Sequence, residues 1–218
     1  MIIYFTGIDG SGKSTITENL VKEVFKDIPV ITIWARYKPK IVKALISKIK
    51  KNFVSDVNNN HLMNSMEYSK WSKYKKRITK SAIISKIIYL LQSFDYLLQL
   101  TKFKNIISTH DDKIIIIDRY LLDFIVDESV NYGDIENNII TKYFLRRLGK
   151  LDFIFFIDTS EAIALNRKKD IPSLEYLRER KKFYRHYIAR MDNGHIINND
   201  FAITETMRKI MVVLNFKQ

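Results

Sequence analysis

The sequence contains no cysteine and little glycine or proline. Without cysteine the chain can form no disulfide, no thiolate zinc site and no thiol nucleophile. Six glycines and three prolines in 218 residues leave no flexible linker that would mark a domain boundary. No apolar run reaches the roughly 18–20 residues that a membrane-spanning helix needs, and the opening MIIYFTG lacks the basic segment of a signal peptide. We therefore expect a single cytoplasmic domain over residues 1–218.

Acidic residues are scarce relative to basic ones, with 24 Asp and Glu against 37 Lys and Arg and a net charge of +13. This excess favours an anionic ligand or partner. Most of it lies in residues 38–80, whose net charge is +10 and whose stretch 39–53 has an apolar helical face. We favour a solvated helix beside an acceptor pocket, since charge runs usually mark exposed faces. A peripheral contact with an anionic membrane is the alternative, and nucleic-acid binding is disfavoured.

Short apolar runs alternate with longer helical patterns along the chain. The runs are continuously apolar, which is typical of strands buried on both faces of a parallel sheet. We expect strands at 2–5, 30–34, 114–118, 153–158 and 195–197. Helical patterns fall at 13–27, 39–53, 62–108 (with a break), 136–148, 160–170, 173–192 and 202–215. The alternation predicts an α/β fold, a three-layer sandwich with a five-stranded parallel sheet that binds ligands beyond the carboxyl ends of its strands.

A glycine-rich loop follows the first expected strand. It matches the G-x-x-x-x-G-K-[ST] pattern of a phosphate-binding loop and reads Gly7, Ile8, Asp9, Gly10, Ser11, Gly12, Lys13, Ser14 and Thr15. Glycines let successive backbone N–H groups surround phosphate oxygens, and the helix that follows adds its free N–H groups. We expect Lys13 to reach the β- and γ-phosphates of ATP and Ser14 to ligate Mg²⁺. The pattern predicts nucleotide binding and a P-loop NTPase fold.

Charged residues follow three other expected strands. Asp118 ends the strand at 114–118, where a carboxylate that holds Mg²⁺ or its waters is expected, and Arg119 offers a fork of donors that suits phosphate. An ion pair between these two residues that only caps the strand is the alternative. Arg36 follows the second strand, and Arg167 ends a helix after the fourth. We expect these arginines to lie at the functional edge of the sheet.

Together these segments resemble the thymidylate kinase family of nucleoside monophosphate kinases. The resemblance rests on GIDGSGKST at the loop, DRY after the third strand and FFIDTSEAIALNRKKDIPSLEYLRERKKFY, and it covers residues 1–36 and about 84–215. It implies ATP and Mg²⁺ as cofactors, phosphoryl transfer to a nucleoside monophosphate, and a homodimer. It also implies a lid at about 166–180.

The resemblance further implies roles for individual side chains. Arg36 and Arg119 would hold the acceptor phosphate, with Tyr120 beside them. Asp9 would lie between donor and acceptor, and Arg167 would reach over the transferred phosphoryl group from the lid. Catalysis of this kind positions two anions and neutralises developing charge. The expected catalytic residues are Asp9, Lys13, Arg119 and Arg167.

The chain departs from the family on the acceptor side. The Arg-Glu-Pro-Gly-Gly that usually follows the second strand is replaced by residues 35–39, which keep the arginine but lose the glutamate and the glycines. Gln92 and Tyr96 stand where the family carries an aromatic residue and a thymine-reading arginine. With Asp95 and Gln99 on neighbouring turns, these side chains can pair with more than one base. We expect a divergent thymidylate kinase-like enzyme without strict thymine specificity.

Two other functions remain open. A kinase for a nucleoside or another small hydroxyl acceptor would use the same loop, but nucleoside kinases of related fold place a glutamate base after the second strand, where this chain has Arg36. A non-catalytic nucleotide-binding protein, regulatory or docked to a membrane, is the other alternative. It is disfavoured because the residues expected for transfer are all present.

Overall fold

The computed structural model of the chain describes residues 1–40, 82–108, 113–133 and 135–215. Five strands form one all-parallel sheet in the order β2-β3-β1-β4-β5. They are β1 (Ile2–Thr6), β2 (Val30–Trp34), β3 (Ile114–Asp118), β4 (Phe153–Asp158) and β5 (Gly194–Asn198). All five strand predictions are confirmed within about a residue at each end. The predicted helix at 39–53 and most of the basic segment 38–80 lie outside the described residues.

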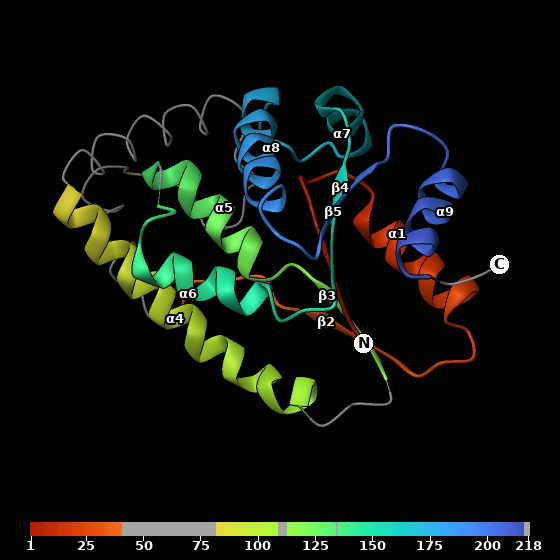
Figure 1. Ribbon diagram of the computed structural model, residues 1–218. Helices are drawn as coiled ribbons and strands as arrows, with labels where there is room; N and C mark the ends of the chain where they lie inside the picture. The colour runs from red at the N-terminus through yellow and green to blue at the C-terminus, as the bar shows by residue number, and fades with distance from the viewer. Residues whose placement is uncertain (41–81, 109–112, 134, 216–218) are drawn as a thin grey trace.

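Helices surround this sheet on both faces (Figure 1). They are α1 (Lys13–Asn19), α4 (Ala82–Ser108), α5 (Leu121–Tyr132), α6 (Ile139–Leu148), α7 (Glu161–Arg167), α8 (Leu174–Ile188) and α9 (Ile203–Val213). A π-helical turn, η1 (Leu20–Val24), continues α1. The predicted helices in the described ranges are confirmed with shorter ends. Among the described helices, none is long and apolar enough to cross a membrane.

The sequence prediction missed α5. Eight of its twelve residues are buried, on every side of the helix. Two of these buried residues, Asp123 and Glu128, are acidic, and charged residues are rarely buried unless they are paired. They interrupt the apolar face by which a helix is identified in the sequence. Gly133, with φ of 82°, ends α5 in a backbone conformation that suits glycine.

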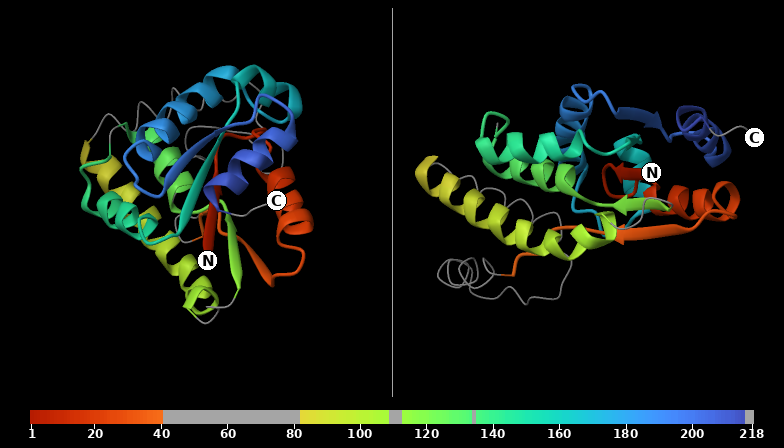
Figure 2. Two further views of the ribbon diagram at one scale, coloured as in Figure 1. Left: turned by 45° about the vertical axis from the view of Figure 1, so that its right-hand side comes forward. Right: turned by 60° about the horizontal axis from the view of Figure 1, so that its bottom comes forward.

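Alternate side chains on the strands pack into two separate cores. On β1, Tyr4 packs with buried side chains of α4, α5, α6 and α8, whereas Ile3 and Phe5 pack with those of α1 and α9. The views in Figures 1 and 2 show these two groups of helices on opposite sides of the sheet. The molecule is therefore a three-layer α/β sandwich. The central strands β1, β3 and β4 are buried on both faces, as the apolar runs predicted, whereas the edge strands β2 and β5 each leave two residues exposed.

The strand order determines where a ligand can bind. From β1 the chain passes to β2 and β3 on one side of the sheet, and then to β4 and β5 on the other. This reversal makes the carboxyl end of β1 the topological switch point, where open α/β sheets bind their ligands. The glycine-rich loop, residues 7–12, begins at that point and leads into α1.

Candidate functional site

The glycine-rich loop is tightly enclosed by other parts of the chain. Gly10 has φ of 78°, and a Cβ on it would overlap the carbonyl oxygen of Ala164 in α7. Gly12 has φ of 89° and directly precedes α1. A side chain at either position would meet both a strained backbone and a close neighbour. The glycines therefore allow α7 and the end of β5 to approach the loop, as the motif requires.

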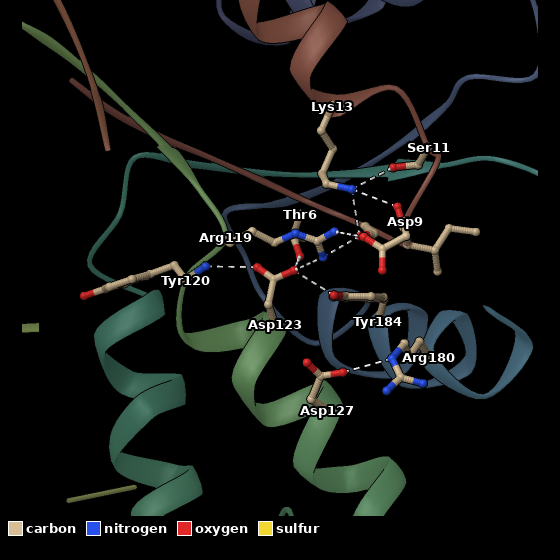
Figure 3. Close-up of polar contacts among 12 residues, drawn as sticks. Thr6, Asp9, Ser11, Lys13, Arg119, Tyr120, Asp123, Asp127, Arg180 and Tyr184 are labelled. Atoms are coloured by element: carbon tan, nitrogen blue, oxygen red, sulfur yellow. Dashed lines mark hydrogen bonds and ion pairs between the residues drawn. The ribbon is translucent and has the colours of Figure 1, made fainter. Parts of the chain in front are cut away.

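Lys13, the first residue of α1, turns back into this loop. Its Nζ donates hydrogen bonds to the carbonyl oxygens of Gly7 at 2.9 Å and Ile8 at 2.8 Å, and to Ser11 Oγ at 3.1 Å (Figure 3). The residue is only 6% exposed. Burial, followed by repulsion from Arg119, lowers the pKa of Lys13 to about 7. An anionic ligand in the loop would oppose both effects and favour the charged form.

Two side chains that the sequence prediction missed donate hydrogen bonds to the backbone of the glycine-rich loop. Asn199, just after β5, donates from Nδ2 to the carbonyl oxygen of Ser11 at 2.8 Å, and Thr159, after β4, donates to the same oxygen at 3.2 Å. Thr206 of α9 in turn donates to Asn199 Oδ1 at 2.8 Å. Both residues follow predicted strands, so their position at the sheet edge was a signal that could have identified them.

Asp118 and Ser14 are the expected magnesium ligands. Asp118 Oδ1 is buried and has no hydrogen-bond partner among the described residues, and burial raises the pKa of this carboxyl. Ser14 is exposed at the start of α1. No cluster of three or more His, Asp or Glu side chains that could hold a metal occurs in the described part of the chain. Mg²⁺ is commonly bound by one or two protein oxygens together with substrate phosphates and waters, so the residues present fit this ion.

Arg119 follows Asp118 with a left-handed backbone, at φ of 64°. Its NH1 donates to the Gly7 carbonyl oxygen at 3.1 Å and to Asp123 at 2.8 Å, while its NH2 donates to Asp9 at 2.5 Å. Burial works to lower the pKa of Arg119, but the charges of Asp123 and Asp9 outweigh it and raise the pKa. The guanidinium is therefore fixed at the mouth of the glycine-rich loop and permanently charged. Figure 3 shows Lys13, Asp9 and Arg119 pointing toward one another.

Asp9 lies between Lys13, in the expected donor site, and Arg119 and Arg36, in the expected acceptor site. Burial works to raise its pKa, but Arg119, Lys13 and Arg36 together hold the pKa well below its usual range, so the side chain stays ionised. Its second oxygen accepts a hydrogen bond from the hydroxyl of Tyr176 in α8 at 3.1 Å. Arg36 is exposed after β2, and its charge also lowers the pKa of Asp118 against the effect of burial. The structure thus gathers the predicted residues from β1, β2 and β3 around Asp9.

The segment predicted as a lid, residues 166–180, also contacts the glycine-rich loop and the residues around it. Arg167, the last residue of α7, donates to the Asn199 carbonyl oxygen at 3.3 Å. Lys168 approaches Asp9 to 3.9 Å. On α8, the Arg180 guanidinium stacks 3.6 Å from the Tyr176 ring and donates to Asp127 of α5 at 2.9 Å. Tyr176 and Arg180, which the sequence prediction did not single out, therefore connect the lid segment to the site.

Three of the α4 residues predicted to bind the acceptor form hydrogen bonds with the segment that follows β2. Tyr96 is buried, and its hydroxyl donates to the Ala35 carbonyl oxygen at 2.7 Å. Asp95 accepts a hydrogen bond from the Lys40 N–H at 2.8 Å, and Gln99 donates to the Lys38 carbonyl oxygen at 2.7 Å. These three side chains fasten the segment after β2 onto α4, a role that the sequence did not predict.

Gln92 and Tyr120 complete the predicted set. Gln92 accepts from the Tyr132 hydroxyl at 2.8 Å and donates to Glu128 at 3.3 Å, so it belongs to a buried polar cluster between α4 and α5. Tyr120 packs edge-on against Tyr4, and Figure 3 shows its ring pointing away from Lys13 and Arg119. Its backbone, not its ring, faces the site.

No protein-family model matches this sequence, and no curated protein matches it. The resemblance to thymidylate kinases therefore rests on the motifs quoted above.

Proposed function

We propose that this chain is a P-loop kinase that transfers a phosphoryl group from ATP to a nucleoside monophosphate, as a divergent relative of the thymidylate kinases. The observation that carries the proposal is the convergence of two cations on one atom. Lys13, from the expected donor site, and Arg119, from the expected acceptor site, both donate to the Gly7 carbonyl oxygen, at 2.9 and 3.1 Å. Two anions bound by these side chains would lie next to each other, which transfer between them requires.

The surrounding residues support a reaction between two phosphates. Lys13 would neutralise charge on the β- and γ-phosphates, and Arg167 approaches the same loop from α7. Ser14 and Asp118 would hold Mg²⁺, which when bound neutralises charge on the phosphate oxygens. The protein itself supplies position and positive charge.

An acceptor that already carries a phosphate fits the charge of the site. Arg36 and Arg119 lie at the carboxyl ends of β2 and β3, and both influence the pKa of Asp9. A second cation beside Arg119 suits a phosphate dianion better than a neutral hydroxyl group. This charge supports a nucleoside monophosphate over the nucleoside acceptor of the alternative function.

The proposal is tested by measuring ADP release from ATP and Mg²⁺ with a panel of nucleoside monophosphates, nucleosides and sugar phosphates. The Lys13→Ala variant is the control for contaminating kinases. We expect turnover with at least one nucleoside monophosphate and none with the unphosphorylated nucleosides. Turnover with nucleosides alone would assign the chain to the alternative kinase class, and nucleotide binding without turnover on any acceptor would assign it to the non-catalytic class.

Two further expectations accompany this function. The homodimer implied by the resemblance stays a prediction that light scattering on the purified chain tests. The cytoplasmic location also stays a prediction, which cell fractionation tests.

A further inference from the structure

A buried carboxylate directly behind Arg119 has no place in the predicted site. Asp123 lies in the first turn of α5, four residues after Arg119, and its side chain is 5% exposed. Its two oxygens accept hydrogen bonds from Tyr4, Thr6, Arg119, Tyr184 and the backbone N–H of Tyr120. These donors come from β1, the end of β3 and α8, so one side chain of α5 joins the sheet to α8 (Figure 3).

This set of donors excludes a direct chemical role for Asp123. A carboxylate offers about four lone-pair positions, and here five donors share them, three on Oδ1 and two on Oδ2. The side chain therefore has no capacity left to accept a proton from a substrate or to ligate a metal ion. Burial works to raise its pKa, but Arg119 and the hydrogen bonds from Tyr4 and Tyr184 lower it, so Asp123 remains an anion.

The Arg119 guanidinium forms ion pairs with two carboxylates, Asp123 of α5 and Asp9 of the glycine-rich loop. Asp123 holds NH1 from the α5 side at 2.8 Å, and Asp9 holds NH2 from the glycine-rich loop at 2.5 Å. Without Asp123, the guanidinium would keep its contacts with Asp9 and the Gly7 carbonyl oxygen, both in the glycine-rich loop, and would be drawn toward that loop. Asp123 thus balances Asp9 and keeps the arginine at the boundary between donor and acceptor.

We propose that Asp123 is a positioning residue that fixes the Arg119 guanidinium in the direction required to hold the acceptor phosphate. The proposal deepens the kinase function and rests on it. A guanidinium fixed in advance loses little entropy when it binds an anion, and a misplacement of about 1 Å can reduce catalysis on the order of 100-fold. The contribution of Asp123 to the reaction therefore acts entirely through Arg119.

The first experiment compares the Asp123→Asn variant with the wild type. Asparagine keeps the shape but removes the charge that opposes Asp9. We expect the acceptor kcat/KM to fall on the order of 100-fold, while the KM for ATP changes less than about threefold. NMR provides a readout that a purely structural role would not change. The side-chain N–H signals of Arg119 are expected to be separate and sharp in the wild type, and averaged in Asp123→Asn.

Control variants separate positioning from loss of stability. Asp158→Asn removes another buried carboxylate, which pairs with Arg185 at 2.5 Å and Lys181 at 2.9 Å on α8. It should lower the melting temperature without changing the acceptor KM or the Arg119 signals. If Asp123→Asn does not fold, Tyr184→Phe removes one donor at 2.7 Å from the same carboxylate and should raise the acceptor KM several-fold.

A double-mutant cycle with Arg119→Lys tests whether Asp123 affects activity only through Arg119. If Asp123 acts only through Arg119, Asp123→Asn should cost little activity once the arginine is absent. Additive losses, or unchanged Arg119 signals in folded Asp123→Asn, would overturn the positioning role. Failure of the kinase function itself looks different, because the wild type would then transfer phosphate to no acceptor while the NMR comparison still reports on the arginine.

Discussion

The side-chain nitrogen of Asn199 lies 2.6 Å from the point that a Cβ on residue 12 would occupy. The two residues are far apart in the sequence, yet the end of β5 closes the back of the glycine-rich loop at this contact. Because Gly12 has no side chain, the Asn199 amide fits beside it and donates a hydrogen bond from Nδ2 to the Ser11 carbonyl oxygen at 2.8 Å. The shape of the donor site therefore depends on the last strand of the sheet as well as the first.

Replacing Asn199 by alanine should weaken ATP binding. The Ser11 carbonyl oxygen would keep the hydrogen bond from Thr159, and loss of one hydrogen bond typically costs about 0.5–1.5 kcal/mol. We expect the KM for ATP to rise about tenfold and the KM for the acceptor to stay within about twofold.

Asn193→Ala is the matched control. At the other end of β5, Asn193 donates to the carbonyl oxygens of Leu148 at 3.0 Å and Leu151 at 2.7 Å. It should reduce thermal stability without changing the KM for ATP. Equal kinetic effects of the two variants would contradict the role of Asn199 in the loop.

Lys13→Ala should reduce phosphoryl transfer by about a thousandfold or more, since a charge placed on the reacting phosphates is lost. The fold should survive, because the Lys13 Nζ donates its hydrogen bonds to atoms of the loop itself, Gly7 O, Ile8 O and Ser11 Oγ. Steady-state kinetics and circular dichroism check both expectations. A turnover within tenfold of the wild type would show that this loop is not the catalytic donor site.

ATP binding at pH 8 should be accompanied by proton uptake. Because burial lowers the pKa of Lys13 to about 7, most molecules of the free protein carry a neutral Lys13 at pH 8. Bound phosphates favour the cation and raise this pKa, so Lys13 takes up a proton and the affinity for ATP falls as pH rises above 7. Calorimetry in buffers with different ionisation enthalpies measures the uptake. It should be absent in Lys13→Met.

The variants Arg36→Lys and Arg119→Lys should each raise the KM for the acceptor more than the KM for ATP. Lysine keeps the charge but loses the two-pronged donor geometry of arginine. We expect the acceptor KM to rise about tenfold in each variant. Arg185→Lys, on the exposed side of α8, is the control. Equal increases in both KM values would point instead to the nucleoside-kinase alternative.

Base preference should be weak and should depend on Gln92. This side chain lies in the polar cluster with Glu128 and Tyr132, where neutral amides and a carboxylate can pair with several base edges. We expect kcat/KM to differ less than about a hundredfold among common nucleoside monophosphates, and Gln92→Ala to change the ranking more than the overall rate. A preference for thymidine monophosphate above a thousandfold would show that other residues read thymine.

The parts of the fold that could be predicted are those encoded by neighbouring residues. Continuous apolar runs identified every strand of the sheet, and the spacing of Gly7, Gly12 and Lys13 identified the loop. Because parallel strands end at a common edge, the sequence also placed Arg119 near this loop. Helix α5 was missed for a physical reason, since two of its buried residues, Asp123 and Glu128, are acidic and interrupt the apolar face on which the prediction depends.

Contacts between distant residues account for the rest. Asn199 meets Ser11 across 188 positions and Asp123 meets Tyr4 across 119. No local pattern marks such a pair, because each residue taken alone is an ordinary polar side chain near a helix or strand end. Tyr96 illustrates the converse case: its place on α4 suggested a base contact, whereas its hydroxyl binds the Ala35 backbone.

The position of β1 between β3 and β4 also affects how the chain folds during synthesis. The first strand has no partner among its near neighbours, because Ile3 pairs with Ile116 and Phe153. At about 5–20 residues per second, a ribosome needs roughly 6–22 s to proceed from the end of β1 to the end of β3. During this interval the apolar segments 2–6 and 30–34 remain without their sheet partners. The parallel sheet around β1 therefore cannot form before β3 has been synthesised, and the apolar N-terminal strand is a point at which chaperones can act.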